Sequence, residues 1–203
     1  MTSLSDTETP HQSSEVANPT SVARERVSAG KQHRVTLDQV LAELGKQHFA
    51  VLSTADDEGT PHSAGVNYGV SEAGGHVALY VMTRAHLRKT RNIARNPKVS
   101  LVIPVARRFL WFLPPATIQV HGRAEILDWT DSEGTEVFTG FWVGRRILDA
   151  YRESNRRGET RICFLKITPD PIISTYMLGV SVWELRSRME KGIGKVTIPP
   201  DRL

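Results

Sequence analysis

One stretch constrains the fold more than any other part of the chain: VALYVMTRAHLRKTRNIARNPKVSLVIPV, residues 77–105. Its first six residues alternate with period two and include β-branched and aromatic side chains, which predicts a strand. Residues 86–95 lose that alternation and predict a helix with a basic stripe. Asn96-Pro97 predicts the helix end, because a residue before proline is pushed out of the α region. Residues 99–105 alternate again and predict a second strand. The inward face of the helix is expected to carry Leu87, Thr90 and Ala94.

The start of this helix is a candidate anion site. Free N–H groups and the positive end of the helix dipole favour an anion there. The sequence places Thr83, Arg84, Arg88 and Lys89 around that end, which suggests a phosphate. The alternative is a solvated basic face on an ordinary crossover helix, which composition alone favours because such helices are common.

The segment 62–70 predicts a strand with two unlike faces. One face is apolar and suits a barrel interior: Ala64, Val66, Tyr68 and Val70. The other is almost bare of side chains: Ser63, Gly65, Asn67 and Gly69. A bare face lets a flat ring system approach the backbone closely. A weak edge strand beside another subunit is an equal alternative.

Further strands and helices follow from the same patterns. Residues 49–54 predict a strand, and Asp56 to Gly59 its turn. Residues 117–127 alternate, so every second residue from Ile118 to Ile126 is expected to face inward. Gln119, His121 and Arg123, which lie between them, are expected to face outward. Residues 161–168 predict the last barrel strand. Helices are expected at 36–44, where Thr36 and Gln39 fit a capping box, at 131–157 with a break near Gly140 or Gly144, and at 181–190.

The central segment resembles that of a known family. The run TRAHLRKTRNIARNPKVSL is similar to the pyridoxamine 5′-phosphate oxidase-like flavin-binding split barrels, as is FAVLSTADDEGTPHSAGVNY, residues 49–68, which resembles their first hairpin. With GRAE at 122–125, the resemblance covers about residues 36–168. It implies a mainly β fold, a six-stranded antiparallel split β-barrel with peripheral helices, acting as a homodimer with its cofactor clefts at the interface.

The resemblance also implies a function and a site. The chain is expected to be an FMN-dependent oxidoreductase that passes hydride through flavin N5 to or from a small substrate. Lys89 would bind the cofactor phosphate, with Arg84 and Arg88 as weaker partners and Thr83 beside them. Gly65, Val66 and Asn67 would lie beside the isoalloxazine, and Gln119 could approach it, often from the partner subunit. Leu87 stands where relatives often have a phosphate-contacting Ser, and His86 is the residue that could compensate.

Two alternatives stay open. A reductase using the deazaflavin coenzyme F-420 needs the same basic pocket and small residues along the ring. A non-catalytic flavin- or haem-binding dimer is an alternative of another class. Pyridoxamine-phosphate oxidation itself is disfavoured, since the signature R-x-H-D-R is absent near Trp183 to Arg188.

Composition narrows the class of protein. The 203 residues carry a formal charge of +4, and because residues 1–30 carry −2 the rest carries +6. A basic body favours anionic partners. The arginines near 152–157 lack the interleaved aromatics of a nucleic-acid platform, and no apolar run is long enough to span a membrane. The single cysteine, Cys163, excludes an internal disulfide, and no H-x-x-x-H or H-E-x-x-H pattern indicates a metal site.

The chain is expected to divide into a tail and one domain. Residues 1–30, rich in Ser, Thr, Pro and Glu, predict a disordered tail. Residues 31–203 predict a single split-barrel domain with a C-terminal helical extension. The aromatic run at 109–115 requires a cover. No signal peptide is recognisable, so a cytoplasmic protein is expected.

Overall fold

The computed structural model describes residues 35–106, 116–179 and 192–203. The expected tail (1–30), the aromatic run (109–115) and the expected helix (181–190) lie outside the described residues. The helices and 3-10 turns are α1 (Leu37–Lys46), η1 (Ala73–Gly75), α2 (Arg88–Arg95), α3 (Ser132–Thr139), α4 (Trp142–Arg156) and η3 (Pro200–Arg202). The strands are β1 (Phe49–Ala55), β2 (Pro61–Ser71), β3 (Ala78–Arg84), β4 (Lys98–Val105), β5 (Ala116–Asp128), β6 (Ile162–Tyr176) and β7 (Ile193–Thr197).

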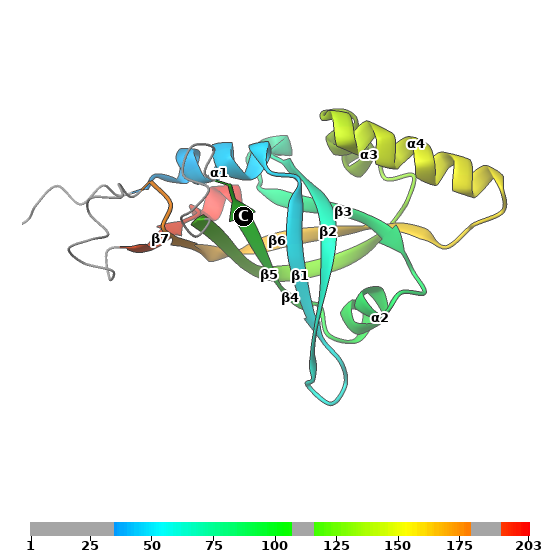
Figure 1. Cartoon of the computed structure of the whole chain (residues 1–203), viewed down its shortest axis with the longest axis horizontal. Coiled ribbons are helices and arrows are strands. Elements are labelled where there is room, and N and C mark those ends of the chain that lie inside the picture. Colours follow the sequence, from blue (N-terminus) through cyan, green and yellow to red (C-terminus); the bar gives the residue numbers. More distant parts are fainter. Residues whose placement is uncertain (1–34, 107–115, 180–191) are drawn as a thin grey trace, which may run out of the picture. The chain divides into compact units, whose positions relative to one another are not determined.

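The strands form one antiparallel sheet that closes on itself. Their order is β3-β2-β1-β4-β5-β6-β7, and β3 also pairs with β6, which closes β1 to β6 into a six-stranded barrel (Figure 1). This confirms the predicted fold class. The barrel edges are removed where β3 and β6 pair, from Leu79↔Ile167 to Arg84↔Ile162. Among the described residues, no helix is long and apolar enough to cross a membrane.

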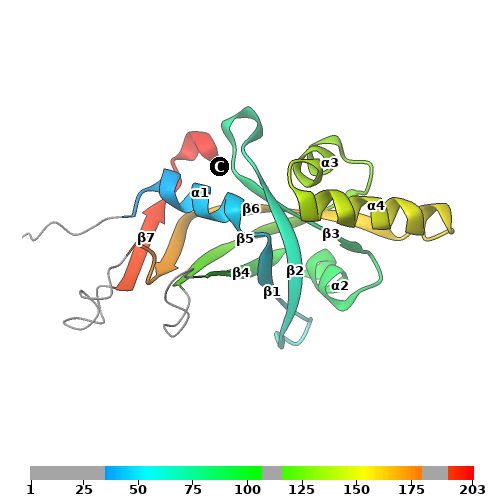
Figure 2. The same cartoon turned by 45° about the horizontal axis from the view of Figure 1, so that its top comes forward.

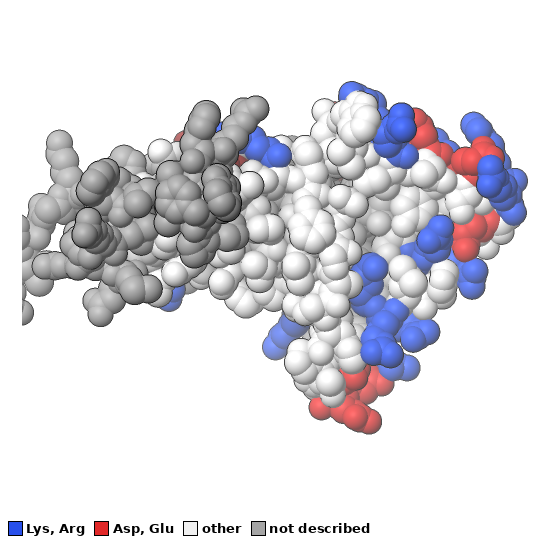
Figure 3. All heavy atoms as spheres, viewed as in Figure 1, with Lys and Arg blue, Asp and Glu red and all other residues white. Residues whose placement is uncertain are grey.

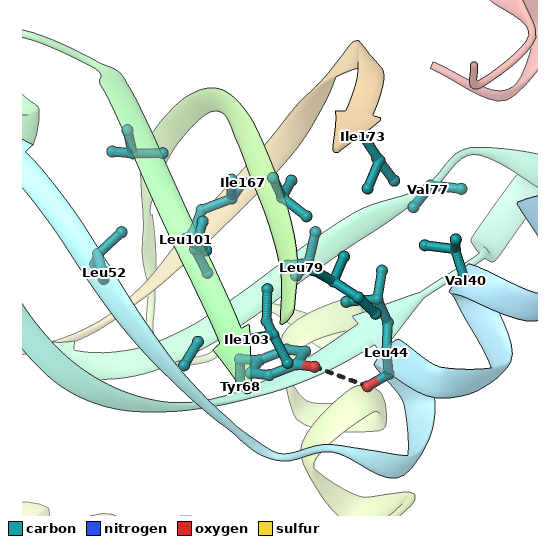
Figure 4. Packing of buried hydrophobic residues seen from close by; sticks show 14 of the residues in the cluster. Val40, Leu44, Leu52, Tyr68, Val77, Leu79, Leu101, Ile103, Ile167 and Ile173 are labelled. Atoms are coloured by element: carbon teal, nitrogen blue, oxygen red, sulfur yellow. Dashed lines mark hydrogen bonds between the residues drawn. The ribbon is translucent and has the colours of Figure 1, made fainter. Parts of the chain in front are cut away.

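The inward faces of the strands fill the barrel with apolar side chains (Figure 4). Helix α1 adds Val40 and Leu44 to this core and begins with the predicted capping box of Thr36 and Gln39. The Tyr68 hydroxyl donates to the carbonyl oxygen of Leu44 at 2.9 Å, which satisfies an acceptor in the last turn of α1. Tyr68 therefore joins β2 to α1 inside the core.

A second apolar cluster lies on the outer side of β3 and β6. Tyr80 and Phe164 project from these strands against α3 and α4, where they meet Phe138 and Leu148. Figures 1 and 2 show the two helices together on this side of the sheet. Strand β3 is buried on both faces for this reason. The predicted break in the helical segment falls at Gly140, which ends α3 before α4 begins.

Four details of the sequence prediction were wrong. The helix begins at Arg88 and not at residue 86, so Leu87 precedes it with extended backbone and is not part of its inward face. Ile126 is 40% exposed, because the inward alternation of β5 ends at Ala124. Ala94 is exposed, whereas the buried side chains of α2 are Thr90, Asn92 and Ile93. The expected end of the last barrel strand at residue 168 was also too early.

Strand β6 continues through Pro169 to Tyr176 and acquires a partner, β7, that the sequence pattern did not predict. Proline cannot donate a ladder hydrogen bond and is confined to edges and bulges. Here the register of β5 shifts between Val120 and Gly122, and Gly122 faces Pro169. This shift in register accommodates the proline, so β6 continues past Pro169. Beyond this point β6 leaves β3 and pairs with β7 instead.

Candidate functional site

The candidate site lies where α2 begins beside the β1–β2 hairpin. Leu87 precedes the helix with extended backbone, and no side chain caps the helix start. The first amides of a helix lack intrahelical acceptors. The backbone N–H groups of Arg88 and Lys89 are therefore available to a ligand.

A cavity of about 240 Å³ opens at this helix end. It lies between β1, β2 and α2 and is lined by Thr54, His62, Ser63, Ala64, Leu87, Arg88 and Lys89. The lining side chains include two cations, two hydroxyls and an imidazole, and no carboxylate. A cavity with this set of side chains has the donors that an anion requires.

Lys89 is the most informative residue of this wall. It is half-buried and forms no hydrogen bond or ion pair with any residue that the structure describes. Burial lowers the pKa of its ammonium from the ordinary value. Its neighbour Cys163 is buried too, and burial raises the pKa of that thiol to about 11, so the thiol is neutral at pH 7. Within the described chain the ammonium thus lacks a counter-ion.

Arg88 is held from the hairpin side. Its Nη1 lies 3.3 Å from Nδ1 of His62, and Nε2 of His62 lies 2.8 Å from Oδ2 of Asp56. The hydrogen bond from His62 is the largest of the effects that hold the pKa of Asp56 below its usual value. The described part of the chain offers Arg88 no carboxylate partner.

The hydroxyls of the wall are tied to neighbouring strands and to α2. The buried Asn92 amide donates to Oγ1 of Thr54 at 3.0 Å, and Thr54 is itself buried. Ser63 exchanges a hydrogen bond of 2.9 Å with Ser53 across the hairpin. Because the Thr54 oxygen already accepts a bond, its O–H remains a donor.

The other predicted phosphate partners do not line the cavity. The Arg84 guanidinium lies 5.2 Å from the Tyr151 ring centroid, and its Nε is 3.9 Å from Oε2 of Glu159. Thr83 is buried in β3, opposite Cys163 of β6. His86 is exposed in the turn before the helix. Of the predicted basic group, Arg88 and Lys89 come together at the cavity.

The predicted ring-binding residues of β2 lie on the same strand as the cavity wall. Gly65 and Asn67 are exposed, whereas the Val66 side chain is buried in the barrel core. A methyl group added at Gly65 would lie 3.0 Å from the exposed Phe49 ring. At Gly69 it would lie 2.4 Å from Val137, because α3 covers that glycine. On the bare face, Phe49 thus lies against Gly65 and α3 covers Gly69, with the exposed Asn67 between them.

Gln119 is exposed on β5, on the outer face of the sheet. In register, Gly65 faces Val51, Val51 faces Val102, and Val102 faces Gln119. Three strand spacings of about 4.8 Å separate Gly65 from Gln119, roughly 14 Å in all. The two residues of one chain therefore do not converge on one contact.

Figure 3 shows this side of the molecule in space-filling form. Lys and Arg gather over α2, next to the acidic tip of the β1–β2 hairpin, while the surface over β1 and β2 carries almost no charge. Sequence reasoning missed His62, Asp56 and Thr54. Their signal was the hairpin itself, because a turn at residues 56–59 brings positions 54 and 62 opposite each other.

A comparison with family models matches the region of the chain that contains this site. Residues 36–175 match the model described as pyridoxamine 5′-phosphate oxidase. The chain belongs to the pyridoxamine 5′-phosphate oxidase family. The match spans the whole closed barrel, from α1 to the end of the β5–β6 pairing, and includes the cavity at α2. No curated protein sequence matches the chain significantly.

Solved structures share the barrel of this family at low sequence identity. The haem storage protein HutZ of Vibrio cholerae is 15% identical, with a TM-score of 0.52 over 68% of this chain and 94% of that one. A haem-binding protein of Mycobacterium smegmatis is 19% identical, with a TM-score of 0.53 over 77% of this chain and 56% of that one. General stress protein 26 of Bacillus anthracis is 23% identical, with a TM-score of 0.47 over 68% and 91%.

Proposed function

We propose that this protein binds FMN, with the phosphate in the cavity at the start of α2, and acts as an FMN-dependent oxidoreductase on a small molecule. The half-buried ammonium of Lys89, which lacks a counter-ion within the described chain, carries the proposal. A buried charge without a partner is costly. A phosphate would provide the missing negative charge, and membership of the family supports a flavin as its source.

The chemistry of the wall fits a phosphate dianion. Lys89 and Arg88 would supply two cations, the first turn of α2 its free N–H groups, and Thr54 a hydroxyl donor. Hydrogen bonds to charged groups contribute on the order of 1.5–3 kcal/mol each. Several such donors around one anion are enough for micromolar binding, which corresponds to about 8 kcal/mol.

The size of the cavity limits what it can hold. At about 240 Å³ it is smaller than the roughly 300–1,000 Å³ of sites that enclose a drug-sized ligand. It would take the phosphate end of the coenzyme, and the ring system would lie outside. Asn67, further along β2 from the cavity wall, is exposed, whereas the Phe49 ring lies against Gly65 and would have to shift for the coenzyme ring to reach the backbone there.

A homodimer would complete this site. The outer face of β1, β2 and β4 carries few charges and exposes Phe49 at 49%. Gln119 of the same chain is too far from Gly65 to share a ring contact, whereas Gln119 of a second copy would be free to reach it. Light scattering of the coenzyme-loaded protein at micromolar concentration should give twice the mass of one chain. A single-chain mass would contradict the dimer.

FMN would supply hydride chemistry at its N5 atom, and the chain would supply binding, orientation and exclusion of water. Lys89 and Arg88 would hold the phosphate end, and the bare stretch of β2 would set how closely the ring approaches the backbone.

Two other coenzymes compete for the same site. Coenzyme F-420 also carries a phosphate, and the cavity does not discriminate against it. Haem carries carboxylates that Arg88 and Lys89 could bind, and two of the similar structures are named as haem proteins. Absorbance of the purified protein separates the three: flavin and deazaflavin bands differ in wavelength, and haem gives a Soret band. Mass spectrometry of the native protein identifies the co-purified molecule.

The decisive experiment compares FMN with riboflavin, which has the same ring and lacks the phosphate. Affinities of the coenzyme-free protein for both are measured by flavin fluorescence. FMN should bind at least tenfold more tightly, since one charged hydrogen bond alone contributes about that factor. Equal affinities would overturn the phosphate assignment. Reduction of the bound flavin by candidate donors under anaerobic conditions then tests turnover, and binding without turnover would indicate a carrier.

A further inference from the structure

The β1–β2 hairpin contacts α2 at both of its ends through two adjacent carboxylates. Asp57 pairs directly with Arg95 in the last turn of the helix. Asp56 reaches the first turn through an intermediate, His62, which contacts Arg88. Figure 1 shows the hairpin and the helix side by side. The second link ends at the cavity, where His62 and Arg88 both belong to the wall.

The direction of these hydrogen bonds is fixed by chemistry. A guanidinium has only donors, so Nδ1 of His62 must accept from Arg88. A neutral imidazole with an accepting Nδ1 carries its proton on Nε2, and this proton faces the Asp56 carboxylate at 2.8 Å. Each partner thus requires the same tautomer of the ring, Nε2–H.

Asp56 is itself immobilised by the turn. Its Oδ1 accepts from the backbone N–H groups of Glu58 at 3.1 Å and Thr60 at 2.9 Å, which leaves Oδ2 for His62. The turn closes through Gly59, whose φ of +80° favours glycine. The hairpin therefore holds the carboxylate, the carboxylate holds the imidazole, and the imidazole contacts the guanidinium.

We propose that His62, oriented by Asp56, is a positioning residue that holds the Arg88 guanidinium over the cavity for the coenzyme phosphate. The proposal rests on the proposed function for the identity of the ligand. Arg88 is exposed and forms no ion pair with the described residues, so this contact is what limits its rotamers. A long side chain loses rotamer entropy when it binds, and fixing it beforehand reduces that cost.

The test uses two substitutions of one residue. His62→Gln keeps an acceptor for Arg88 and a donor for Asp56, whereas His62→Leu keeps the approximate size and removes both. We expect His62→Leu to weaken FMN binding roughly three- to tenfold, the factor that one net hydrogen bond carries. His62→Gln should stay within about twofold of wild type. Riboflavin affinity should not change in either variant.

Two further measurements separate positioning from a merely structural role. In an Arg88→Ala background, His62→Leu should cause no additional loss of FMN affinity, because it acts through Arg88. Asp57→Asn is the matched control, since it removes the other link between the same hairpin and helix, and FMN affinity should be unchanged. Equal losses in Asp57→Asn and His62→Leu, or additive losses with Arg88→Ala, would overturn the proposal.

Nitrogen NMR of the coenzyme-free protein tests the link without any ligand. At slightly alkaline pH, His62 should show a protonated Nε2 and a bare Nδ1, and Arg88→Ala should allow the other tautomer to appear. A proton on Nδ1 in the wild type would refute the link. If wild type binds FMN and riboflavin equally, the proposed function fails, while the NMR result still decides whether the imidazole is positioned as described.

Discussion

Lys89→Met should weaken coenzyme binding without lowering the stability of the coenzyme-free protein. Methionine keeps an unbranched side chain of similar length and removes only the charge, so the packing of the side-chain stem is preserved. Burial lowers the pKa of Lys89, and no described residue pairs with its ammonium. Folding therefore desolvates this charge without compensation. The same charge is the main attraction for a phosphate, so its loss should be felt only when the coenzyme is present.

The expected magnitudes follow from these contacts. Without coenzyme, Lys89→Met should leave the free energy of unfolding unchanged or raise it by up to about 0.5 kcal/mol, the range of substitutions outside the core. This corresponds to a rise in melting temperature of at most about 2 °C. FMN affinity should fall roughly ten- to hundredfold, the value of one hydrogen bond between charged groups. Riboflavin affinity should not change.

The pH dependence has a defined sign. The pKa of Lys89 is lowered in the folded protein from 10.5, so in alkaline solution below that value the unfolded chain binds more protons. The free energy of unfolding of the wild type should therefore rise as the pH increases from the lowered pKa towards 10.5. Over the same range the difference in stability between Lys89→Met and the wild type should become smaller.

The assays are urea unfolding of the coenzyme-free protein and fluorescence titration with FMN and riboflavin. Arg95→Met is the matched control: it lies at the other end of α2 and forms an exposed ion pair with Asp57. Exposed pairs contribute only about 0–1 kcal/mol, so FMN affinity should be nearly unchanged. Equal weakening of FMN by both substitutions would show a general effect of charge. A Lys89→Met variant that binds FMN like wild type would refute the reasoning.

Three further predictions concern the framework of the site. Tyr68→Phe removes the hydrogen bond to the last turn of α1 and should destabilise the protein by about 1–2 kcal/mol in urea unfolding, with the barrel otherwise intact. Gly122→Ala places a methyl group 2.2 Å from the backbone oxygen of Thr168. The strain at the β5–β6 bulge should destabilise the protein by about 1–3 kcal/mol and lower its melting temperature by several degrees. Glu159→Gln tests a lowered pKa. Hydrogen bonds from Arg161 lower the pKa of Glu159 from its ordinary value of 4.5 to about 2. The loss of stability that the substitution causes at neutral pH should therefore disappear as the pH falls from 4.5 to about 2.

Much of the fold was predictable because its signals are local. The alternation of strands 62–70, 99–105 and 117–127 follows from a pleat that turns successive side chains to opposite faces. The capping box at Thr36 and the helix end at Asn96-Pro97 are likewise set by neighbouring backbone groups. Lys89 and Arg88 were placed at the helix start by counting residues alone, and the cavity lies there.

Strand β7 and the long β6 could not be predicted in the same way. A proline after Thr168 normally ends a strand, and only the register shift in β5, a strand some fifty residues earlier in the chain, accommodates Pro169. The exposure of Ile126 has a similar origin, since alternation predicts two faces without saying where the neighbouring layer ends.

Local patterns in the sequence predicted most of the helices and strands and the cations at one helix end, and the family resemblance implied an antiparallel barrel. The tertiary structure decided which of those cations face the cavity. Arg84 has the same charge as Arg88, but it lies at the end of a strand beside Glu159 and Tyr151, and its guanidinium contacts these two residues. Arg88 meets His62 across the hairpin instead. The residue type alone gives the charge of a side chain. The partner of that charge depends on which segments, distant in the sequence, the closed barrel brings within a few ångströms.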